Sequence, residues 1–380
     1  MDSFHVVTAP GLEPFVALEL ERLGLVPEKH TAGIAPGRVA FYGGQGDLWC
    51  ANLGLATADR VLAILGEFRA AAFSELRKKA ARLPWERVFA PGGSVAIRVA
   101  CHKSRLYHTG AVAERVAGAI ADRLGEPPRL HEPQDDEGAG AAQTIFVRFE
   151  SDACTIAADS SGELLHRRGY RLAVAKAPLR ETLAAVMLLA SGWDRASPLL
   201  DPFCGSGTIA IEAARMAEGI APGRGRRFAF MDWPGFDRGR WESMIAGKAT
   251  PAPGGTPIIM ASDRDAGAIR MATANAERAG VADRIRFERL SVSDISPPRG
   301  QGWVVTNPPW GVRTDNGKDL RDLYARLGDV LRERCRGWNV AILSGDKRLL
   351  DRTRLDLDTS LALVNGGLRV RLARGVVPEV

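Results

Sequence analysis

The sequence predicts an α/β protein whose larger part is a mostly parallel sheet with helices on both faces. From about residue 179 onward, helical and extended segments alternate along the chain, and the extended segments are near-continuous apolar runs. This alternation is typical of a parallel sheet that is buried on both sides. The first 165 residues predict smaller α+β modules, because short strands and amphipathic helices follow one another there without this alternation.

The composition predicts a folded protein of two to three domains. The chain has 380 residues, of which 46% are hydrophobic and 25% charged, enough to build a core in each domain. No apolar run approaches the roughly 18 residues of a membrane span, and the first residues do not resemble a secretion signal. The five cysteines form no C-x-x-C pair, which indicates reduced thiols. We therefore expect a cytoplasmic protein rather than a secreted or membrane protein.

The elements of the first 165 residues predict two α+β modules. In residues 1–65, a helical pattern lies between two strand-like runs, FHVVTA and RVAFYG. Residues 126–143 are rich in Pro, Gly and acids and predict a surface loop. The remaining predicted elements are a helix at Phe73–Arg82, a strand at Ser94–Cys101, a helix at Gly110–Leu124, and strands at Thr144–Glu150 and Cys154–Asp159.

Positive charge is concentrated in the second of these modules. Residues 66–125 carry eleven Lys or Arg against five Asp or Glu, a local surplus equal to the net charge of +6 of the whole chain. A local surplus of cations is typical of a nucleic-acid-binding surface. On charge alone, an Arg-rich solvated helix face explains the surplus equally well.

The alternating part predicts a sheet interrupted by one excursion, residues 219–255, which is rich in Gly, Pro, Arg and Trp. The predicted helices are Leu179–Ser191, Ser206–Glu218, Asp265–Ala279 and Lys318–Arg336. The predicted strands are Pro198–Pro202, Pro257–Ser262, Ile285–Leu290, Gly302–Asn307, Asn339–Ser344, Ser360–Val364 and Gly367–Leu372. Ligands of such sheets bind beyond the carboxyl ends of the strands.

The segment LLDPFCGSGTIAIEAA, residues 199–214, predicts a ligand-binding turn. Gly205 and Gly207 allow a tight turn and a close approach of the backbone to a ligand, and the helix that follows directs unpaired N–H groups at it. The spacing fits either a dinucleotide or S-adenosylmethionine. Asp201 favours S-adenosylmethionine, because a carboxylate attracts a cationic amino group and repels a pyrophosphate.

Two further acids follow predicted strands at the same edge. Asp263 is suited to accept hydrogen bonds from both ribose hydroxyls of a nucleoside, whereas Asp265 predicts a helix N-cap. Asp294 follows the next strand, where its carboxylate or the neighbouring backbone could bind an adenine amino group. For Asp294 alone, a surface-loop acid is an equal alternative.

The segment VVTNPPW, residues 304–310, predicts a site for an aryl amine. Pro308 and Pro309 end the strand and hold Asn307 and the Pro308 carbonyl at the binding edge. Two acceptors held there can bind both hydrogens of an exocyclic amine, and Trp310 offers a flat face on which a base can stack. Cys204 lies inside the glycine turn and predicts packing rather than catalysis, and the six histidines form no metal-binding cluster.

These motifs together resemble those of the amino-methyltransferases that modify exocyclic nitrogens of nucleobases. The segments Lys176–Trp193 and Leu165–Arg171 resemble bacterial large-subunit rRNA guanine-N2 methyltransferases with a THUMP domain. CHKSRLYHTGAVAERVAGAIAD resembles the basic strand, loop and helix of a THUMP module, and TAPGLEPFVALELERLG resembles the short domain that precedes it. The resemblance implies a ferredoxin-like domain over residues 1–65, a THUMP RNA-binding domain over 66–165, and a Rossmann-like class I methyltransferase domain over 166–380. In the last, the final strand of the sheet is antiparallel.

The resemblance implies an S-adenosylmethionine-dependent enzyme that methylates the N2 amine of a guanosine in large-subunit (23S) rRNA. Asp263 would hold the ribose and Asp294 the adenine of the donor, while Arg180 or Glu181 would reach its methionine end. The fourth motif of the family usually ends in Tyr where this chain has Trp310, so stacking is kept and a hydroxyl is lost. The donor site would be formed by Asp201, Phe203, Gly205 and Gly207.

Other functions stay open at this point. A tRNA guanine would undergo the same chemistry, and N-P-P-W would serve a DNA adenine-N6 methyltransferase equally well. An RNA-binding protein with a vestigial cofactor site and a dehydrogenase are further alternatives. We expect an RNA partner and neither a membrane nor a metal. The sequence does not determine the modified nucleotide, the number of methyl groups, the oligomeric state, or whether free RNA or an assembly intermediate is the substrate.

Overall fold

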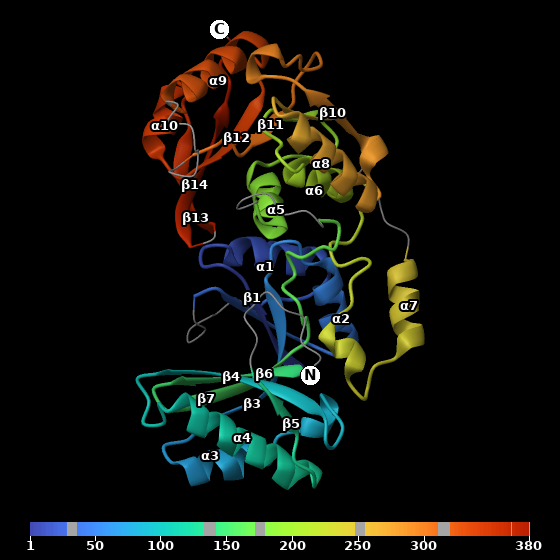
Figure 1. Ribbon diagram of the computed structural model, residues 1–380, viewed down its shortest axis with the longest axis vertical. Coiled ribbons are helices and arrows are strands. Elements are labelled where there is room, and N and C mark those ends of the chain that lie inside the picture. The colour runs from blue at the N-terminus through green and yellow to red at the C-terminus, as the bar shows by residue number, and fades with distance from the viewer. Residues whose placement is uncertain are drawn as a thin grey trace. The chain divides into compact units, whose positions relative to one another are not determined.

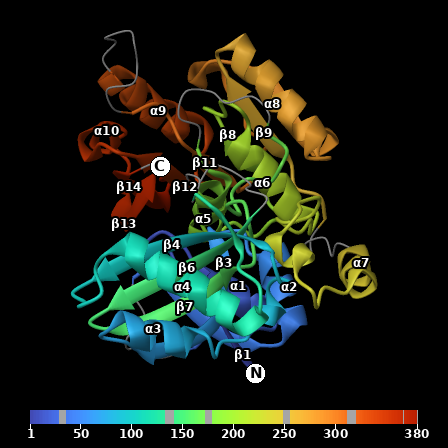
Figure 2. The ribbon, with the colours of Figure 1, turned by 60° about the horizontal axis from the view of Figure 1, so that its bottom comes forward.

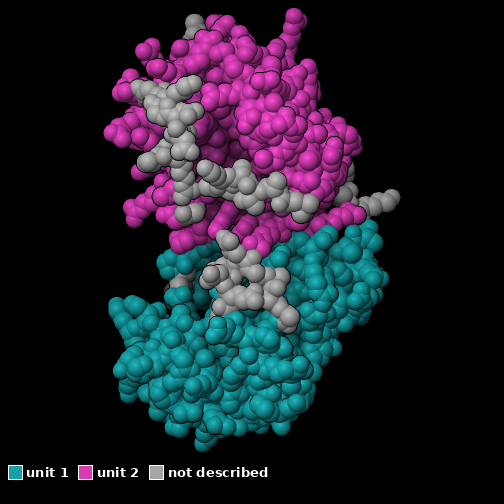
Figure 3. Space-filling model, viewed as in Figure 1, with its two compact units in different colours: residues 1–8, 16–165, 225–247 teal, residues 9–15, 166–224, 248–380 magenta. Residues whose placement is uncertain are grey.

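The computed structural model describes residues 1–28, 36–132, 142–171, 179–247, 255–310, 320–365 and 367–379. The chain divides into two compact units (Figure 3). The first contains residues 1–8, 16–165 and 225–247, and the second contains residues 9–15, 166–224 and 248–380. Part of the loop expected at 126–143 lies outside the described residues, as do Lys176 and the first residues of the helix expected from Lys318.

The first unit is built on one seven-stranded mixed sheet, in the order β2-β1-β3-β7-β6-β4-β5. β4 runs parallel to β5 and β6, and the other neighbours are antiparallel. β3 passes through position 65 and pairs with β1 and β7, so one sheet serves both predicted modules. The strands are β1 Asp2–Val7, β2 Arg38–Gly43, β3 Arg60–Arg69, β4 Ser94–His102, β5 Arg129–His131, β6 Gln143–Glu150 and β7 Ala153–Asp159.

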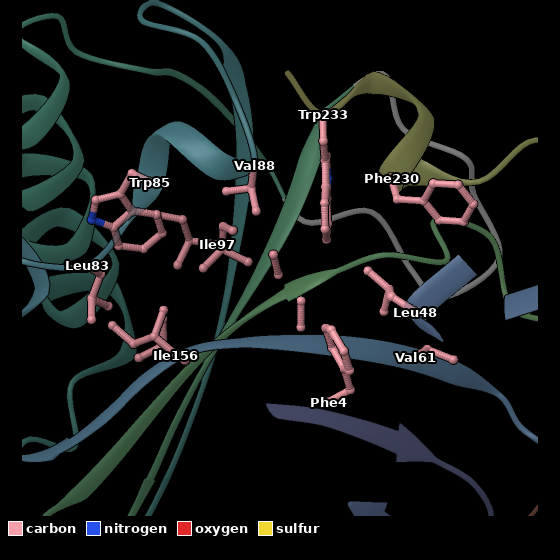
Figure 4. Close-up of a cluster of buried hydrophobic side chains, with 14 of the residues drawn as sticks. Phe4, Leu48, Val61, Leu83, Trp85, Val88, Ile97, Ile156, Phe230 and Trp233 are labelled. Atoms are coloured by element: carbon pink, nitrogen blue, oxygen red, sulfur yellow. The ribbon is translucent and has the colours of Figure 1, made fainter. Parts of the chain in front are cut away.

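Helices pack their apolar side chains against this sheet to form one core. Figure 4 shows part of it, with Phe4 of β1, Leu48 of α2 and Val61 of β3 among the buried side chains. Trp85 is fully buried, and its indole N–H donates to the Ala80 carbonyl at 2.8 Å, so burial leaves no polar atom of this ring unpaired. The helices are α1 Glu13–Arg22, α2 Gln45–Gly54, α3 Phe73–Ala80, α4 Thr109–Leu124 and α7 Arg238–Ala246.

Part of the predicted excursion belongs to the first unit. Phe230 stacks on Trp49 of α2 with ring centroids 5.7 Å apart, and its backbone N–H donates to Ser160. The indole N–H of Trp233 donates to the Gln143 side chain at 2.6 Å. Residues 225–247 interrupt the alternating part in the sequence, but in the structure they belong to the first unit and complete its core.

The second unit confirms the predicted α/β class. Its seven-stranded sheet has the order β10-β9-β8-β11-β12-β14-β13. The first five strands are parallel, and β14 runs antiparallel to β12 and to β13, as expected for the last strand (Figure 1). The strands are β8 Leu199–Asp201, β9 Ile259–Asp263, β10 Ile285–Arg289, β11 Trp303–Thr306, β12 Asn339–Ser344, β13 Asp358–Asn365 and β14 Leu368–Val376.

Side chains along these strands alternate between two buried faces. Leu199 and Leu343 pack with α5, α6 and α8, whereas Leu200 and Ile342 pack with α9 and α10. Figure 2 shows α6 and α8 on one side of the strands and α9 and α10 on the other. Burial of both faces explains why the central strands β8, β11 and β12 are nearly continuous apolar runs. The helices are α5 Glu181–Ala190, α6 Thr208–Ala217, α8 Ala266–Arg278, α9 Leu320–Arg334 and α10 Lys347–Arg352.

The predicted elements of the alternating part are all present with shifts of a few residues at their ends. In the first unit, the loop expected at 126–143 is wrong at Arg129–His131, which form β5 because they pair with β4. The sequence also did not predict α2, β3 and α7 of the first unit or α10 of the second. Within the described ranges, no helix is long and apolar enough to cross a membrane.

Candidate functional site

Polar side chains meet at the carboxyl edge of the parallel strands in the second unit. Asp201 is the last residue of β8 and Asp263 the last of β9, while Asn307 directly follows β11. Because β8 lies between β9 and β11 in the sheet, the three residues come from adjacent strands. This edge is where open α/β sheets bind their ligands.

The turn between β8 and α6 is held open by its two glycines. Gly205 and Gly207 have φ angles of +51° and +84°, which side-chain-bearing residues rarely adopt. A Cβ at Gly207 would lie 3.0 Å from the Cβ of Ala272 on α8, so α8 packs directly against this turn. The left-handed residue at Gly207 delays the helix, which begins at Thr208 rather than at the predicted Ser206.

Asp201 is a buried carboxylate with one unused oxygen. Its side chain is 1% exposed, and Oδ1 accepts hydrogen bonds from the Thr306 hydroxyl at 2.7 Å and from the Phe203 N–H at 3.3 Å. Oδ2 is buried without a hydrogen-bond partner in the described part of the chain. Burial raises the pKa of Asp201 to about 7, although the Thr306 hydrogen bond opposes the rise. A buried acceptor of this kind is suited to a cationic group that enters from outside.

Asp263 links the two strand ends. Its Oδ2 accepts the Gly205 N–H at 3.1 Å, and its Oδ1 accepts the Asp265 N–H at 2.9 Å. Asp265 accepts the Gly267 N–H at 2.7 Å, which confirms it as the N-cap of α8. Asp294 lies exposed in a 3-10 turn, Val292–Asp294, after β10, at the same edge of the sheet but at its outer strand.

The strand end at Asn307 is held by the residues after it. The indole N–H of Trp310 donates to Asn307 Oδ1 at 2.9 Å, while Pro308 is buried and Pro309 exposed. The ring of Trp310 is part-buried against the apolar clusters of the unit, and Phe203 contacts one of these clusters. Trp310 therefore packs against the core of the second unit, and only the exposed part of its ring is available to stack on a base.

The segment before α5 places a buried ionic network beside the glycine turn. Glu181 is buried, with its carboxylate 3.6 Å from the guanidinium of Arg171, and burial raises its pKa despite that cation. Arg171 also donates to the Thr208 hydroxyl at 2.6 Å, at the first residue of α6. Arg180 is the exposed N-cap residue of α5. Glu181 is thus joined to the turn through Arg171, whereas Arg180 faces solvent.

These residues fit S-adenosylmethionine better than a dinucleotide. The unpaired Oδ2 of Asp201 suits the cationic amino group of the donor, and no described atom lies within 4 Å of a Cβ built on Gly205, so the backbone there is approachable. Cys204 is buried, and burial raises the pKa of its thiol far above the ordinary value, which disfavours the thiolate that nucleophilic chemistry needs. Over the described residues, no group of three or more His, Cys, Asp or Glu could hold a metal ion.

Thr306, Thr208 and Arg171 were not identified from the sequence as site residues. Thr306 lies on β11 and Asp201 on β8, which are neighbours in space but far apart in the chain. The signal for Thr306 was a polar residue at the end of the apolar run VVT, directly before Asn307. Arg171 carries no such signal, because its partners come from two different helices.

Three family models match the chain. Residues 168–373 match a model described as RMKL-like, methyltransferase domain. Residues 3–62 match the RlmL ferredoxin-like domain, and residues 70–159 match the THUMP domain.

Similar proteins span the chain almost completely. A Synechocystis sp. protein named as a proposed RNA methyltransferase is 34% identical over 374 residues, 98% of this chain and 96% of its own length. The ribosomal RNA large subunit methyltransferase K/L of Methylococcus capsulatus is 36% identical over 96% of this chain, which spans only 50% of that protein. The crystal structure of SMU.472, a protein named as a proposed methyltransferase and complexed with S-adenosylhomocysteine, is 29% identical. It covers 100% of this chain and 99% of its own, with a TM-score of 0.86.

Proposed function

Because the chain belongs to the RMKL-like methyltransferase family, we propose that it methylates the exocyclic N2 amine of a guanosine in large-subunit rRNA. Its cofactor is S-adenosylmethionine, which supplies an electrophilic methyl group. The observation that carries the proposal is the position of Asn307 and Pro308 directly after β11, next to the strand that ends in Asp201. Two acceptors are thereby held at the edge where the donor site is built.

The residues around Asn307 explain why an amine is the target. The lone pair of an exocyclic aryl amine is delocalised into the ring, so the amine is a weak nucleophile until hydrogen bonds draw its hydrogens out of the ring plane. Asn307 Oδ1 and the Pro308 carbonyl are the acceptors for this task. Both are anchored, since Pro308 is buried and Asn307 is hydrogen-bonded to Trp310. Catalysis would come mainly from this positioning.

For the donor site we propose the roles that follow from the contacts described above. Asp201 would accept the donor ammonium and Asp263 its ribose hydroxyls, while Asp294 would reach the adenine. Gly205 and Gly207 keep the turn open, and Phe203 lines it. Glu181 would act on the methionine end through Arg171, and Arg180 would contact it only if its exposed side chain turned inward.

The first unit supplies the properties expected of an RNA-binding part. It contains the THUMP match and the charge surplus of residues 66–125. Some of these cations are paired, for example Arg77 with Asp122 at 2.7 Å. Arg105 lies 3.2 Å from Asp152, yet its side chain stays 74% exposed. The rRNA assignment rests on relatives named large-subunit methyltransferases K/L, of which this chain spans about half. A ribosomal substrate would place the enzyme in the cytoplasm.

Methyl transfer by the purified protein tests this proposal. We expect labelled methyl to pass from S-adenosylmethionine to protein-free large-subunit rRNA and to appear in N2-methylguanosine. Asn307→Ala should lower kcat by about a hundredfold or more, because it removes one of two acceptors for the amine, while cofactor affinity stays within about twofold. Asn339→Ala, at the first residue of β12 and so at the opposite edge of the sheet, is the matched control.

Other outcomes would change the substrate or the base that we assign to the enzyme. Label in tRNA guanosine would keep the chemistry and contradict the rRNA substrate. Label in DNA N6-methyladenine would contradict both the base and the polymer. A loss of cofactor binding in Asn307→Ala that matches its loss of kcat would remove Asn307 from the amine site.

A further inference from the structure

Trp310 fixes the orientation of the Asn307 side-chain amide. Its indole Nε1 lies 2.9 Å from Asn307 Oδ1. The indole nitrogen can only donate, so the amide atom that faces it must be the carbonyl oxygen and not the NH₂ group. The side-chain amide of an asparagine is otherwise free to choose between two orientations about its terminal torsion. The contact with Trp310 selects one of them.

The indole ring is itself held in place by the strand next to β11. Gly345 directly follows β12, the neighbour of β11 in the sheet. A Cβ built on Gly345 would lie 2.5 Å from Cε3 and 2.6 Å from Cζ3 of Trp310, closer than any real Cβ contact. The ring therefore occupies the space that a side chain at position 345 would need, and only glycine leaves that space open. Apolar clusters on both faces of the sheet bury part of the rest of the ring.

We propose that Trp310 is a positioning residue that presets the Asn307 carbonyl oxygen for the target amine, with Gly345 providing the space for its ring. A carbonyl oxygen has two lone pairs, so one accepts the indole N–H and the other is left for the amine. The free enzyme then holds the acceptor ready, and no amide reorientation is needed when the base arrives. This role rests on the proposed function, and it differs from the stacking surface that the sequence predicted.

Two variants separate the hydrogen bond from the packing. Trp310→Phe keeps an aromatic ring over Gly345 and removes the donor, whereas Gly345→Ala keeps the donor and displaces the ring. We expect each to lower kcat about three- to tenfold, the effect of one net hydrogen bond, with the KM for S-adenosylmethionine unchanged. Trp303→Phe is the matched control. It removes an indole hydrogen bond of 3.1 Å to the carbonyl of Ser191, which follows α5, and Trp303 lies at the first residue of β11, away from the site.

A spectroscopic readout tests the contact without any turnover. In the ¹H–¹⁵N spectrum of the free protein, the indole signal of Trp310, identified by its absence in Trp310→Phe, should shift and exchange faster with solvent in Asn307→Ala. The Trp303 signal should stay in place. In addition, the two residues should act as a coupled pair. The loss of kcat in the double variant Asn307→Ala, Trp310→Phe should therefore be smaller than the product of the two single fold-losses.

The outcomes distinguish this proposal from the function on which it rests. An unchanged Trp310 signal in Asn307→Ala, or a wild-type kcat in both Trp310→Phe and Gly345→Ala, would overturn the positioning role alone. Multiplicative effects in the double variant would also overturn it. A wild-type protein that transfers no methyl group to any nucleic acid would instead overturn the proposed function, whatever the indole signal shows.

Discussion

Binding of S-adenosylmethionine should strengthen as the pH rises toward neutrality, because Asp201 must lose a proton to receive the donor. Burial raises the pKa of this carboxyl to about 7 in the free protein. The ammonium of the donor would stabilise the ionised form and lower that pKa in the complex. Below pH 7 the Asp201 carboxyl must therefore be deprotonated on binding, and this deprotonation lowers the net binding free energy. With the carboxyl fully ionised in the complex, affinity should rise about fifteenfold between pH 5.5 and pH 7.

Isothermal titration calorimetry measures this effect directly. Titrations at several pH values below 7.5, where the donor α-amino group remains cationic, give the affinity. Repeating them in buffers of different ionisation enthalpy gives the number of protons released. 5′-Methylthioadenosine is the matched ligand, because it keeps the nucleoside and lacks the ammonium, so its affinity should not change with pH.

Asp201→Asn supplies the matched protein. It should bind the donor more weakly at pH 7 and lose the pH dependence. It should also raise the melting temperature of the free protein at pH 7.5 but not at pH 4. The folded-state pKa lies above the unfolded value, so stability falls as pH rises through the window between them. A donor affinity that is flat from pH 5.5 to 7, or an equal rise for 5′-methylthioadenosine, would refute the assignment of Asp201 to the ammonium.

Three further predictions concern the turn, the ribose and the RNA surface. Asp263→Ala should weaken S-adenosylmethionine about tenfold or more in equilibrium dialysis, because it removes the proposed ribose acceptor and frees the glycine turn; unchanged affinity would exclude it from the site. Gly207→Ala should weaken the donor and lower the melting temperature, since it places a Cβ at a φ of +84° and against α8; a variant as stable as wild type would contradict the strain. Neutralising three cations of the first unit should weaken RNA binding and lower the slope of log affinity against log salt by about two to three, and an unchanged slope would move the RNA surface elsewhere. The three are Lys78, Lys79 and Arg105.

The strand ends of the second unit could be predicted because their chemistry is local. A buried parallel strand is largely apolar, so the polar residues that end each run mark the binding edge. This logic identifies Asp201, Asp263 and Asn307 from the amino-acid sequence alone, and the fold brings them to adjacent strands. It also locates β12 at Asn339–Ser344, with both ends as observed.

The missed features depend on contacts between distant parts of the chain. The hydrogen bond from Thr306 to Asp201 requires the pairing of β8 with β11, which are separated by an intervening β9 and β10 along the chain. β3 was missed because a glycine and a bulge interrupt its apolar run, between Ile64 and Gly66. The packing of residues 225–247 in the first unit carries no periodic signal, since these residues are held by aromatic contacts such as that of Phe230 with Trp49.

We propose that this chain places a methyl group on guanosine N2 of large-subunit rRNA through Asn307. The most direct test is nucleoside mass spectrometry of rRNA from a strain that lacks this protein, before and after complementation. Wild-type protein should restore an N2-methylguanosine that is missing from the large-subunit rRNA, and the Asn307→Ala variant, expressed at the same level, should not. Full restoration by Asn307→Ala would contradict the role of Asn307, and an N2-methylguanosine content that does not depend on the protein would contradict the proposed function.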